Sequence, residues 1–355
     1  MRKAAGRIGL FSLALVLALP ALAADATKTL WSVTSFGASD YFQEPSDIEV
    51  DNARSLIYVV DAGSSRVLLF DFEGKFLRAV GNKGQGPGEF VRPTGAGLLP
   101  GGGLAVADLG NNRIETFDAA GKFVRSVTMT EARVADLVFS GGRFFTVPSA
   151  GASNYSLNMG SKDDNQPLVN VLDEQGKKVL EISVADFPET HPFIRAIKHR
   201  VCLALSPKGR LYLPYFAMNL VHVFETTGKK KGGFSRPLPF QPITPTLHQQ
   251  RSPEPGIVQM GANIDFVSMA AKFGPDGKLY ILTVTDSVAE IRKTNPELKD
   301  PYPMRFDVIE PESYLASDAI ACDAGVKAFG LMDGGRLVYV YEDAEGELTL
   351  KCVRF

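Results

Sequence analysis

A fixed offset of 47 positions links two stretches of this chain of 355 residues. The segment Arg66–Asp71 (Arg-Val-Leu-Leu-Phe-Asp) precedes the related segment Arg113–Asp118 by that offset, and Gly74 precedes Gly121 by the same 47. Both stretches consist of short alternating apolar runs cut by turns rich in Gly, Pro and Asp, which is typical of small antiparallel sheets. A repeat of this length, with four strands in each unit, predicts the blades of a β-propeller.

The number of blades follows from the second strand of each repeat. Five of the candidate runs follow a tight turn that contains Gly, which supplies the positive φ that such hairpins need. The runs are Leu56–Asp61, Leu104–Asp108, Arg143–Val147, Arg210–Leu213, Lys278–Thr283 and Arg336–Tyr341. We therefore predict an all-β fold, a six-bladed β-propeller with four-stranded antiparallel blades.

The two ends of the chain are expected to close the ring. After Arg336–Tyr341, the last blade keeps only Glu347–Phe355 for a third strand and nothing for a fourth. The run Thr29–Phe36, in which Trp31 and Val33 alternate, precedes the first inner strand. We expect this N-terminal strand to complete the last blade, because both end blades would otherwise present long unpaired edges.

Several landmarks between Pro45 and Val127 resemble the NHL repeat of six-bladed β-propellers. They are Glu89-Phe90-x-x-Pro93, Ala107-Asp108-x-x-Asn111-Asn112-Arg113-Ile114 and Phe117-Asp118-x-x-Gly121-Lys122-Phe123. The resemblance is strong over this stretch, and only its outline remains in the later blades. It implies an exported bacterial member of the NHL-repeat propeller family.

The first 23 residues have the pattern of an export signal. Basic residues lead into an apolar run from Ile8 to Leu19, and Ala21-Leu22-Ala23 forms a small-x-small cleavage site. We expect cleavage after Ala23, which leaves a single propeller domain at 24–355 in a periplasmic or secreted protein. No later apolar run is long enough for a membrane helix.

Charge and cysteine content narrow the choice of partners. Loss of the three basic residues in 1–23 changes the formal net charge from −2 to −5, which argues against an electrostatic nucleic-acid binder. Three cysteines cannot all pair, and we expect all three to stay free. We expect a monomer without a cofactor.

The strand order predicts two different faces. If strands run from the channel to the rim, the connections between blades and between second and third strands emerge on one face, which we call the loop face. The opposite side, the turn face, carries the remaining turns. We expect long segments on the loop face at Pro148–Gln166, Ala185–Arg200, Ser235–Asp265 and Glu310–Gly325. On the turn face, only Thr294–Tyr302 is expected to be long.

Long loops on one side of a rigid scaffold are where binding residues usually lie. The loop-face candidates combine aromatic, apolar and basic side chains, a mixture enriched in interfaces. They are Arg92, Tyr155, Phe193, Arg195, Lys198, His199, Arg251 and Met260. Prolines between Pro237 and Pro255 predict an extended, stiff segment. These residues either bind a partner or form a lid over the channel, and the sequence does not decide between the two.

The central channel is the other candidate site. Aligned inner strands place Asp47 and Asp136 at one level, two blades apart. Six-bladed lactonases of the gluconolactonase type hold a divalent metal on the axis with Glu, Asn and Asp, whereas hard cations need six or more oxygens. The NHL-like lyase of peptide amidation uses zinc held by His, but the loop histidines His191, His199 and His248 lack metal-ligand spacing.

The other chemistry-bearing residues favour structural roles. Asp108 and Arg113 recur one repeat earlier as Asp61 and Arg66, which predicts that each Arg contacts the carboxylate within its own blade. Cys202 is expected to be a small buried apolar residue. The chain contains no Gly-x-Ser-x-Gly nucleophile elbow and no P-loop.

These observations favour an exported, non-catalytic binding module that takes a protein or small-molecule ligand on its loop face. The alternative is a metal-dependent hydrolase or lyase, lactonase-like or amidating-lyase-like, with Ca²⁺ or Zn²⁺ in the channel. A third possibility is a structural partner of envelope machinery. No catalytic residue is assigned.

Overall fold

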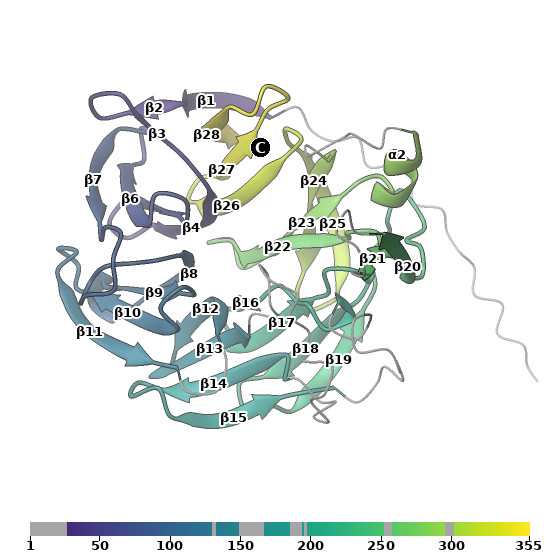
Figure 1. The fold of residues 1–355 in the computed structure, drawn as a ribbon, viewed down its shortest axis with the longest axis horizontal. Coiled ribbons are helices and arrows are strands. Elements are labelled where there is room, and N and C mark those ends of the chain that lie inside the picture. Colours follow the sequence, from purple (N-terminus) through teal and green to yellow (C-terminus); the bar gives the residue numbers. More distant parts are fainter. Residues whose placement is uncertain are drawn as a thin grey trace, which may run out of the picture.

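The computed structural model describes residues 27–129, 133–148, 167–184, 194, 197–251, 258–294 and 302–355. Six four-stranded antiparallel sheets surround a central axis, which confirms the predicted all-β, six-bladed propeller (Figure 1). The export signal predicted at 1–23 lies outside the described residues.

The first three blades run in order from the channel to the rim. Their strands are β4 (Pro45–Asp51), β5 (Leu56–Asp61), β6 (Arg66–Asp71) and β7 (Phe76–Val80); β8 (Pro93–Leu98), β9 (Leu104–Asp108), β10 (Arg113–Phe117) and β11 (Phe123–Thr128); and β12 (Val134–Ser140), β13 (Arg143–Pro148), β14 (Val169–Asp173) and β15 (Lys178–Ile182). A short 3-10 turn, η1 (Pro100–Gly102), joins β8 to β9.

The fourth and fifth blades follow the same order. Their strands are β16 (Ala204–Leu205), β17 (Arg210–Pro214), β18 (Val221–Glu225) and β19 (Lys230–Phe234), then β22 (Ser268–Phe273), β23 (Leu279–Val284), β24 (Met304–Glu310) and β25 (Leu315–Ala321). The sixth blade contains β26 (Val326–Met332), β27 (Arg336–Glu342), β28 (Leu348–Arg354) and β1 (Lys28–Val33). All six predicted second strands are correct to within one residue at each end.

The N-terminal strand closes the ring as predicted. β1 pairs antiparallel with β28, and Trp31 Nε1 donates a hydrogen bond to the carbonyl oxygen of Phe72 at 2.9 Å. The closing strand is shorter than Thr29–Phe36, because β2 (Ser35–Phe36) turns back and pairs with β3 (Asp40–Tyr41). The Phe36 side chain is buried in the core shared by the first and last blades.

The inner strands share an irregularity that sets their level in the channel. In five blades the inner strand has a bulge near its first residue, opposite the end of the blade's second strand. The residue just after the bulge has the same position in each of these five blades. The residues at this position are Asp47, Gly95, Asp136, Ala270 and Ala328. The common level predicted for Asp47 and Asp136 is therefore correct. The inner strand of the fourth blade, β16, has only two residues.

Two buried carboxylates fix the connections that enter the first two blades. Asp61 accepts hydrogen bonds from the backbone N–H groups of Gln43 and Glu44, and Asp108 accepts them from Val91 and Arg92. Both side chains are fully buried, so these bonds replace the water that the carboxylates lose.

The arginines of the repeat differ between the two blades. Arg113 lies 3.5 Å from Asp108 and 2.8 Å from Glu115, as the predicted contact within the blade requires. Its counterpart Arg66 instead forms its ion pair with Asp40 at 2.6 Å, which corrects the prediction for the first blade. The reason is that the β2–β3 hairpin brings a second carboxylate to this position.

Two predicted long segments of the fifth blade are wrong. Glu310–Gly325 contains the outer strand β25, whose alternating exposed residues gave little hydrophobic signal, so this blade-to-blade connection is short. Thr294–Tyr302 lies between the second and third strands, after the helix α2 (Val288–Thr294), and therefore belongs to the loop face. Ser287 caps this helix by accepting a hydrogen bond from Glu290 N at 3.2 Å.

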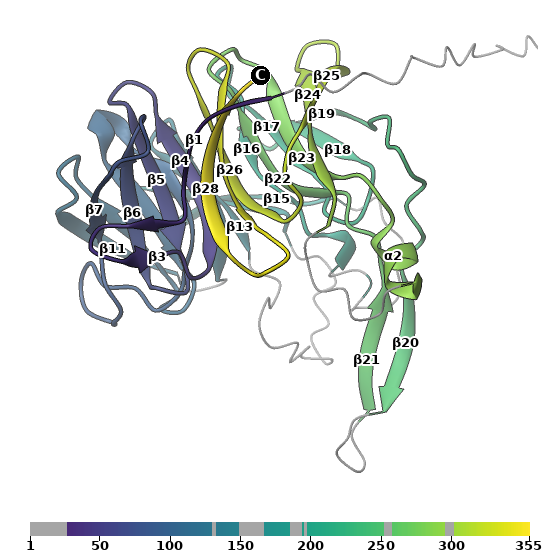
Figure 2. The same cartoon turned by 90° about the horizontal axis from the view of Figure 1, so that it is seen from above.

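The Pro-rich insertion is also different from the predicted extended segment. It contains a two-stranded hairpin, β20 (Thr246–Arg251) and β21 (Val258–Asn263), with Thr246 opposite Asn263. Figure 2 shows that this hairpin projects well beyond the blades, on the side where α2 lies. It stands near the rim beside the fifth blade (Figure 1), so it does not cover the channel mouth as a lid would.

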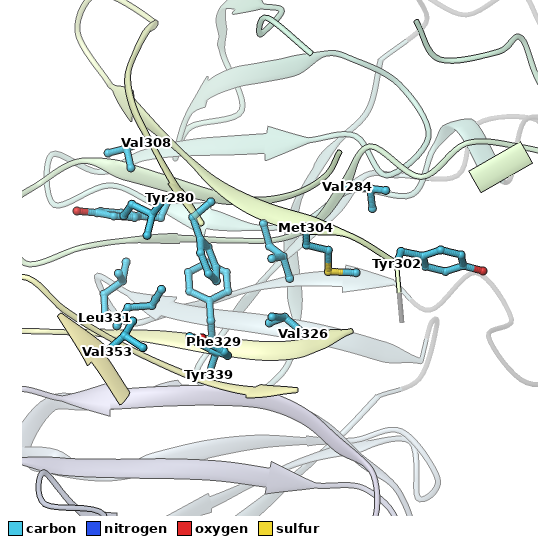
Figure 3. Packing of buried hydrophobic residues seen from close by; sticks show 14 of the residues in the cluster. Tyr280, Val284, Tyr302, Met304, Val308, Val326, Phe329, Leu331, Tyr339 and Val353 are labelled. Carbon is cyan, nitrogen blue, oxygen red and sulfur yellow. The ribbon is translucent and has the colours of Figure 1, made fainter. Parts of the chain in front are cut away.

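The hydrophobic core is divided among the interfaces of neighbouring blades. Between the fifth and sixth blades, Tyr280 and Met304 face Phe329 and Tyr339 (Figure 3). The rings of Phe306 and Phe329 pack edge to face with their centroids 4.9 Å apart. Each blade is therefore held by apolar packing against its neighbours, which leaves the channel and the loops free for polar side chains.

Candidate functional site

The two predicted channel carboxylates approach the inner strand of the second blade from opposite sides. Asp47 Oδ2 accepts a hydrogen bond from Ala96 N at 2.9 Å. A Cβ atom on Gly95 would lie only 2.8 Å from Asp136 Oδ1, so the absence of a side chain at Gly95 makes room for this carboxylate. The structure therefore brings Asp47 and Asp136 to the same strand, β8.

Two further charged residues of the channel were missed in the sequence. Lys272, on the inner strand of the fifth blade, places Nζ 3.0 Å from Asp47 Oδ1 and also contacts the carboxylate of Glu49. Glu49 follows Asp47 by two residues, and Lys272 follows Ala270 by two, so both lie on the channel side of their strands. Residues two apart on a strand point to the same side, so counting two residues on from Asp47 and from Ala270 would have identified Glu49 and Lys272.

Asp47, Glu49, Asp136 and Lys272 form one charged group, which we call the channel cluster, and burial and neighbouring charges shift the pKa values of Glu49, Asp136 and Lys272. Burial, followed by the charge of Asp47, raises the pKa of Asp136 to about 7. Burial also raises the pKa of Glu49, and the nearby Lys272 ammonium only partly opposes this. Burial alone would lower the pKa of Lys272, but the three carboxylates outweigh it and raise that pKa.

The channel cluster does not fit a divalent metal ion. The Lys272 ammonium already lies between the carboxylates of Asp47 and Glu49, where a cation ligated by both would have to sit. Among the described residues, no group of three or more His, Cys, Asp or Glu side chains is arranged to hold a metal. What the cluster offers is one buried donor group surrounded by acceptors.

The three cysteines are all free thiols. Cys202 lies beside the channel cluster, with Sγ 3.6 Å from the carbonyl oxygen of Ser268. Burial, and then the charge of Asp136, raises the pKa of its thiol to about 12. A thiol with such a pKa is protonated at neutral pH and is a poor nucleophile.

A cavity of about 450 Å³ lies where the inner strands reach the turn face. Its lining comes from the first, third, fourth, fifth and sixth blades and includes Glu49 and Lys272 of the channel cluster. Its lining residues lie at turns of the turn face, whereas the hairpin β20–β21 projects from the other face (Figure 2).

The loop-face candidates do not form one described cluster. Arg92 is exposed and pairs with Glu44 at 2.5 Å, whereas Lys198 and His199 are half-buried in the connection between the third and fourth blades. Tyr155, Phe193 and Arg195 lie outside the described residues, as do the side chains of Arg251 and Met260.

The base of the hairpin insertion is held by a buried arginine that the sequence did not reveal. Arg236 follows the last strand of the fourth blade and donates to Ser268 Oγ at 2.7 Å and Thr283 Oγ1 at 2.8 Å, both in the fifth blade. It also lies 3.3 Å from Asp307, and the side chains of both residues are almost fully buried. Burial lowers the pKa of Arg236, and Asp307 opposes this.

The other end of the insertion is fixed in a similar way. The buried carboxylate of Asp265 accepts hydrogen bonds from Ile243 N at 2.9 Å, from the Ser287 hydroxyl at 2.8 Å and from Ala289 N at 3.0 Å. These bonds tie the insertion to the start of α2. Both ends of the segment that carries the hairpin are therefore rigidly mounted on the fifth blade.

Comparison with known proteins gives a family and one structural likeness. A family model, DUF5128, described as "6-bladed beta-propeller", matches residues 39–223, just over half of the chain. No curated protein sequence matches. Among solved structures, the hydrazine synthase of Kuenenia stuttgartiensis is similar with a TM-score of 0.45 and 12% identity, over 84% of this chain and 77% of that one. No helix in the described part of the chain is long and apolar enough to cross a membrane.

Proposed function

The chain belongs to the DUF5128 family of 6-bladed beta-propellers, and from that premise we propose that it is an exported, non-catalytic binding module that engages a protein partner through its loop face. The observation that carries this proposal is the hairpin β20–β21, which projects from the loop face and is fixed at both ends of its insertion (Figure 2). The NHL-like repeat and the signal-like N-terminus support the assignment to exported propellers.

A projecting hairpin suits partner binding for a physical reason. An isolated two-stranded hairpin is marginally stable in water, and its outer edges expose unpaired backbone groups. The charge-assisted bonds of Arg236 and Asp265 fix its base, so little conformational entropy is lost when a partner pairs with it or packs on it. A partner strand or surface gains backbone hydrogen bonds there, which is a common mode of peptide recognition.

The metal-dependent hydrolase is the weaker alternative. Its metal would need the carboxylates of the channel, but Lys272 already neutralises two of them. The geometry therefore favours binding over hydrolysis, and no step of a reaction is assigned to these residues.

Photocrosslinking in the exporting cell tests the proposal. A photoreactive amino acid replaces Gln249, in the middle of β20, or the exposed Lys208, on a hairpin turn of the turn face. We expect a discrete adduct from position 249 and none from position 208. Adducts from position 208 alone, or from neither position, would contradict the proposed surface.

Binding by the purified, identified partner then locates the contact. Arg195→Ala, His199→Ala and Arg251→Ala should each weaken binding at least about 10-fold, as interface hot spots do. Lys208→Ala and Asp276→Ala, on the turn face, should leave the affinity unchanged. Melting temperatures of all variants serve as the control for folding, and the reverse pattern of affinities would move the site to the turn face.

A further inference from the structure

The cavity of the turn face is a second place where this molecule can bind a ligand, independent of the hairpin. Its volume of about 450 Å³ is within the usual range for small-molecule sites and equals that of roughly 15 water molecules. The walls come from Glu49, Ser140, Leu205, Lys272, Phe273 and Leu331, which belong to five different blades. A ligand there would lie at the mouth of the channel.

The polar side of the cavity presents a donor and an acceptor next to each other. Lys272 and Glu49 contact one another, and each keeps about a fifth of its side-chain surface accessible, 22% and 19%. Lys272 uses its ammonium on Asp47 and Glu49 and retains donor capacity, and Glu49 retains acceptor lone pairs. A hydroxyl group, which both donates and accepts, matches this pair.

The charges favour a ligand without net charge. An anion would be repelled by Asp47, Glu49 and the nearby Asp136. A cation would compete with Lys272 for the carboxylates that this ammonium already binds. A neutral molecule leaves the ion pair intact and still forms charge-assisted hydrogen bonds with it.

The lining of the cavity also has apolar members. They are Leu205, Phe273 and Leu331, and the half-buried ring of Phe273 packs against Tyr212 with centroids 5.1 Å apart. A lining that combines polar and apolar side chains suits a ligand with both hydroxyl groups and C–H groups, which is the chemistry of a sugar ring.

We propose that this cavity binds a neutral saccharide, with its hydroxyl groups on Glu49 and Lys272 and its apolar face against Phe273. The size of the cavity admits a mono- or disaccharide.

Titration of the purified protein with neutral and charged sugars tests this assignment. The neutral probes are D-glucose, D-galactose, D-mannose, maltose, cellobiose and lactose, and the charged ones are D-glucosamine and D-glucuronate. Saturation-transfer NMR should show binding of at least one neutral sugar, tighter than either charged sugar. Binding by no neutral sugar, or tighter binding of a charged one, overturns the proposal.

Two variants place the binding in the cavity. Ser140→Phe fills the hollow without touching the ion pair and should abolish binding, whereas Ser313→Phe makes the same change on an exposed turn of the same face and should not. Glu49→Gln should weaken binding about 10-fold, the effect of losing one charge-assisted hydrogen bond. Melting temperatures confirm that each variant folds, and unchanged binding by Ser140→Phe also overturns the proposal. Deletion of the hairpin should leave sugar binding intact, so the proposed sugar site and the proposed partner surface are tested independently of each other.

Discussion

The junctions among the first three blades and the junction between the fourth and fifth blades are built in different ways. In the first region, inner strands approach at the level of the backbone: Asp47 accepts a hydrogen bond from Ala96 N, and a Cβ on Gly95 would lie 3.0 Å from the Asp136 Cα atom. In the second region, the contact is made by side chains, with Arg236 reaching into the fifth blade.

The difference explains where the molecule has room for function. Backbone-level contact leaves no room for a side chain at the points of closest approach on β8, which are Gly95 and Gly97. The fourth inner strand has two residues and the fifth carries Lys272, and residues of both blades line the cavity together with residues of three other blades. The same junction carries the hairpin insertion, because a side-chain contact tolerates a long segment between the two blades.

The largest expected effect comes from removing the buried arginine of the fourth–fifth junction. Arg236→Met should lower the free energy of unfolding by about 4 kcal/mol, because the buried Asp307 loses a charge partner and Ser268 and Thr283 lose a donor. Urea unfolding measures this. The matched control is Arg305→Met, since Arg305 contacts the same Asp307 from a more exposed position and should cost only about 1 kcal/mol. If both variants lost the same free energy of unfolding, burial of the arginine at this junction would be unimportant.

The buried carboxylate of the second blade should have the next largest effect. Asp108→Asn should cost about 2–3 kcal/mol, because the amide cannot accept as strongly from Val91 N, Arg92 N and Asn111 at the same time. Hydrogen exchange at the Val91 and Arg92 amides should accelerate more than exchange in β14 of the third blade. If exchange rises equally everywhere, Asp108 does not act locally on this connection.

Backbone-level packing can be tested with a pair of opposite substitutions at the same level of the ring. Gly95→Ala should cost about 2 kcal/mol, because its Cβ would lie 3.0 Å from the Asp136 Cα atom of the third blade. The reverse change in the fifth blade, Ala270→Gly, should cost only about 0.5–1 kcal/mol, the ordinary entropic cost of glycine in a strand. Thermal melts of the two variants compare their stabilities directly. If Gly95→Ala lowered the stability less than Ala270→Gly does, the distinction between the two regions would be wrong.

The last prediction concerns the pH dependence of the channel cluster. The pKa of Asp136 is raised to about 7 from 3.8, so the folded protein holds this proton more tightly than the unfolded chain. The resulting stabilisation is complete below pH 3.8 and is lost as the pH rises through about 7.

Asp136→Asn, which resembles the protonated acid, should therefore match the wild type near pH 4 and be more stable near pH 8, by up to about 4 kcal/mol, since each pKa unit is worth about 1.4 kcal/mol. Urea unfolding of both proteins across this pH range measures the difference in stability. Glu49 titrates in both proteins, so the difference reports on Asp136. A stability difference that does not change with pH would falsify the assignment.

The sequence predicted most of the fold because its signals are local. The runs Leu56–Asp61 and Leu104–Asp108 were correct at both ends, since a short apolar run between two turns defines a buried strand. Strand β25 was missed because Leu315 is 67% exposed and the strand's polar residues read as a loop. Helix α2 has a capping pattern at Ser287 and Glu290, but seven residues are too few for a clear helical period.

The candidate site was only half predicted from the sequence. Asp47 and Asp136 were found because the repeat places them at one level of the channel, but their partner Lys272 was not. The hairpin β20–β21 was also missed, since its register depends on pairing across a segment that reads as Pro-rich and irregular.

What the sequence by itself determined was the repeating unit: the number of blades, their second strands, the N-terminal closure and the level of the channel carboxylates. The second strands depend on residues that are close in the chain, and the blade number and the level of the carboxylates follow from the repeat. The closure follows from the strand that is missing in the last blade. Only the tertiary structure decided which side chains meet. Lys272 and Glu49 are 223 positions apart, and Arg236 and Thr283 are 47 apart in different blades. Ring closure brings such pairs together, because the position of every inner strand depends on the packing of all six blades.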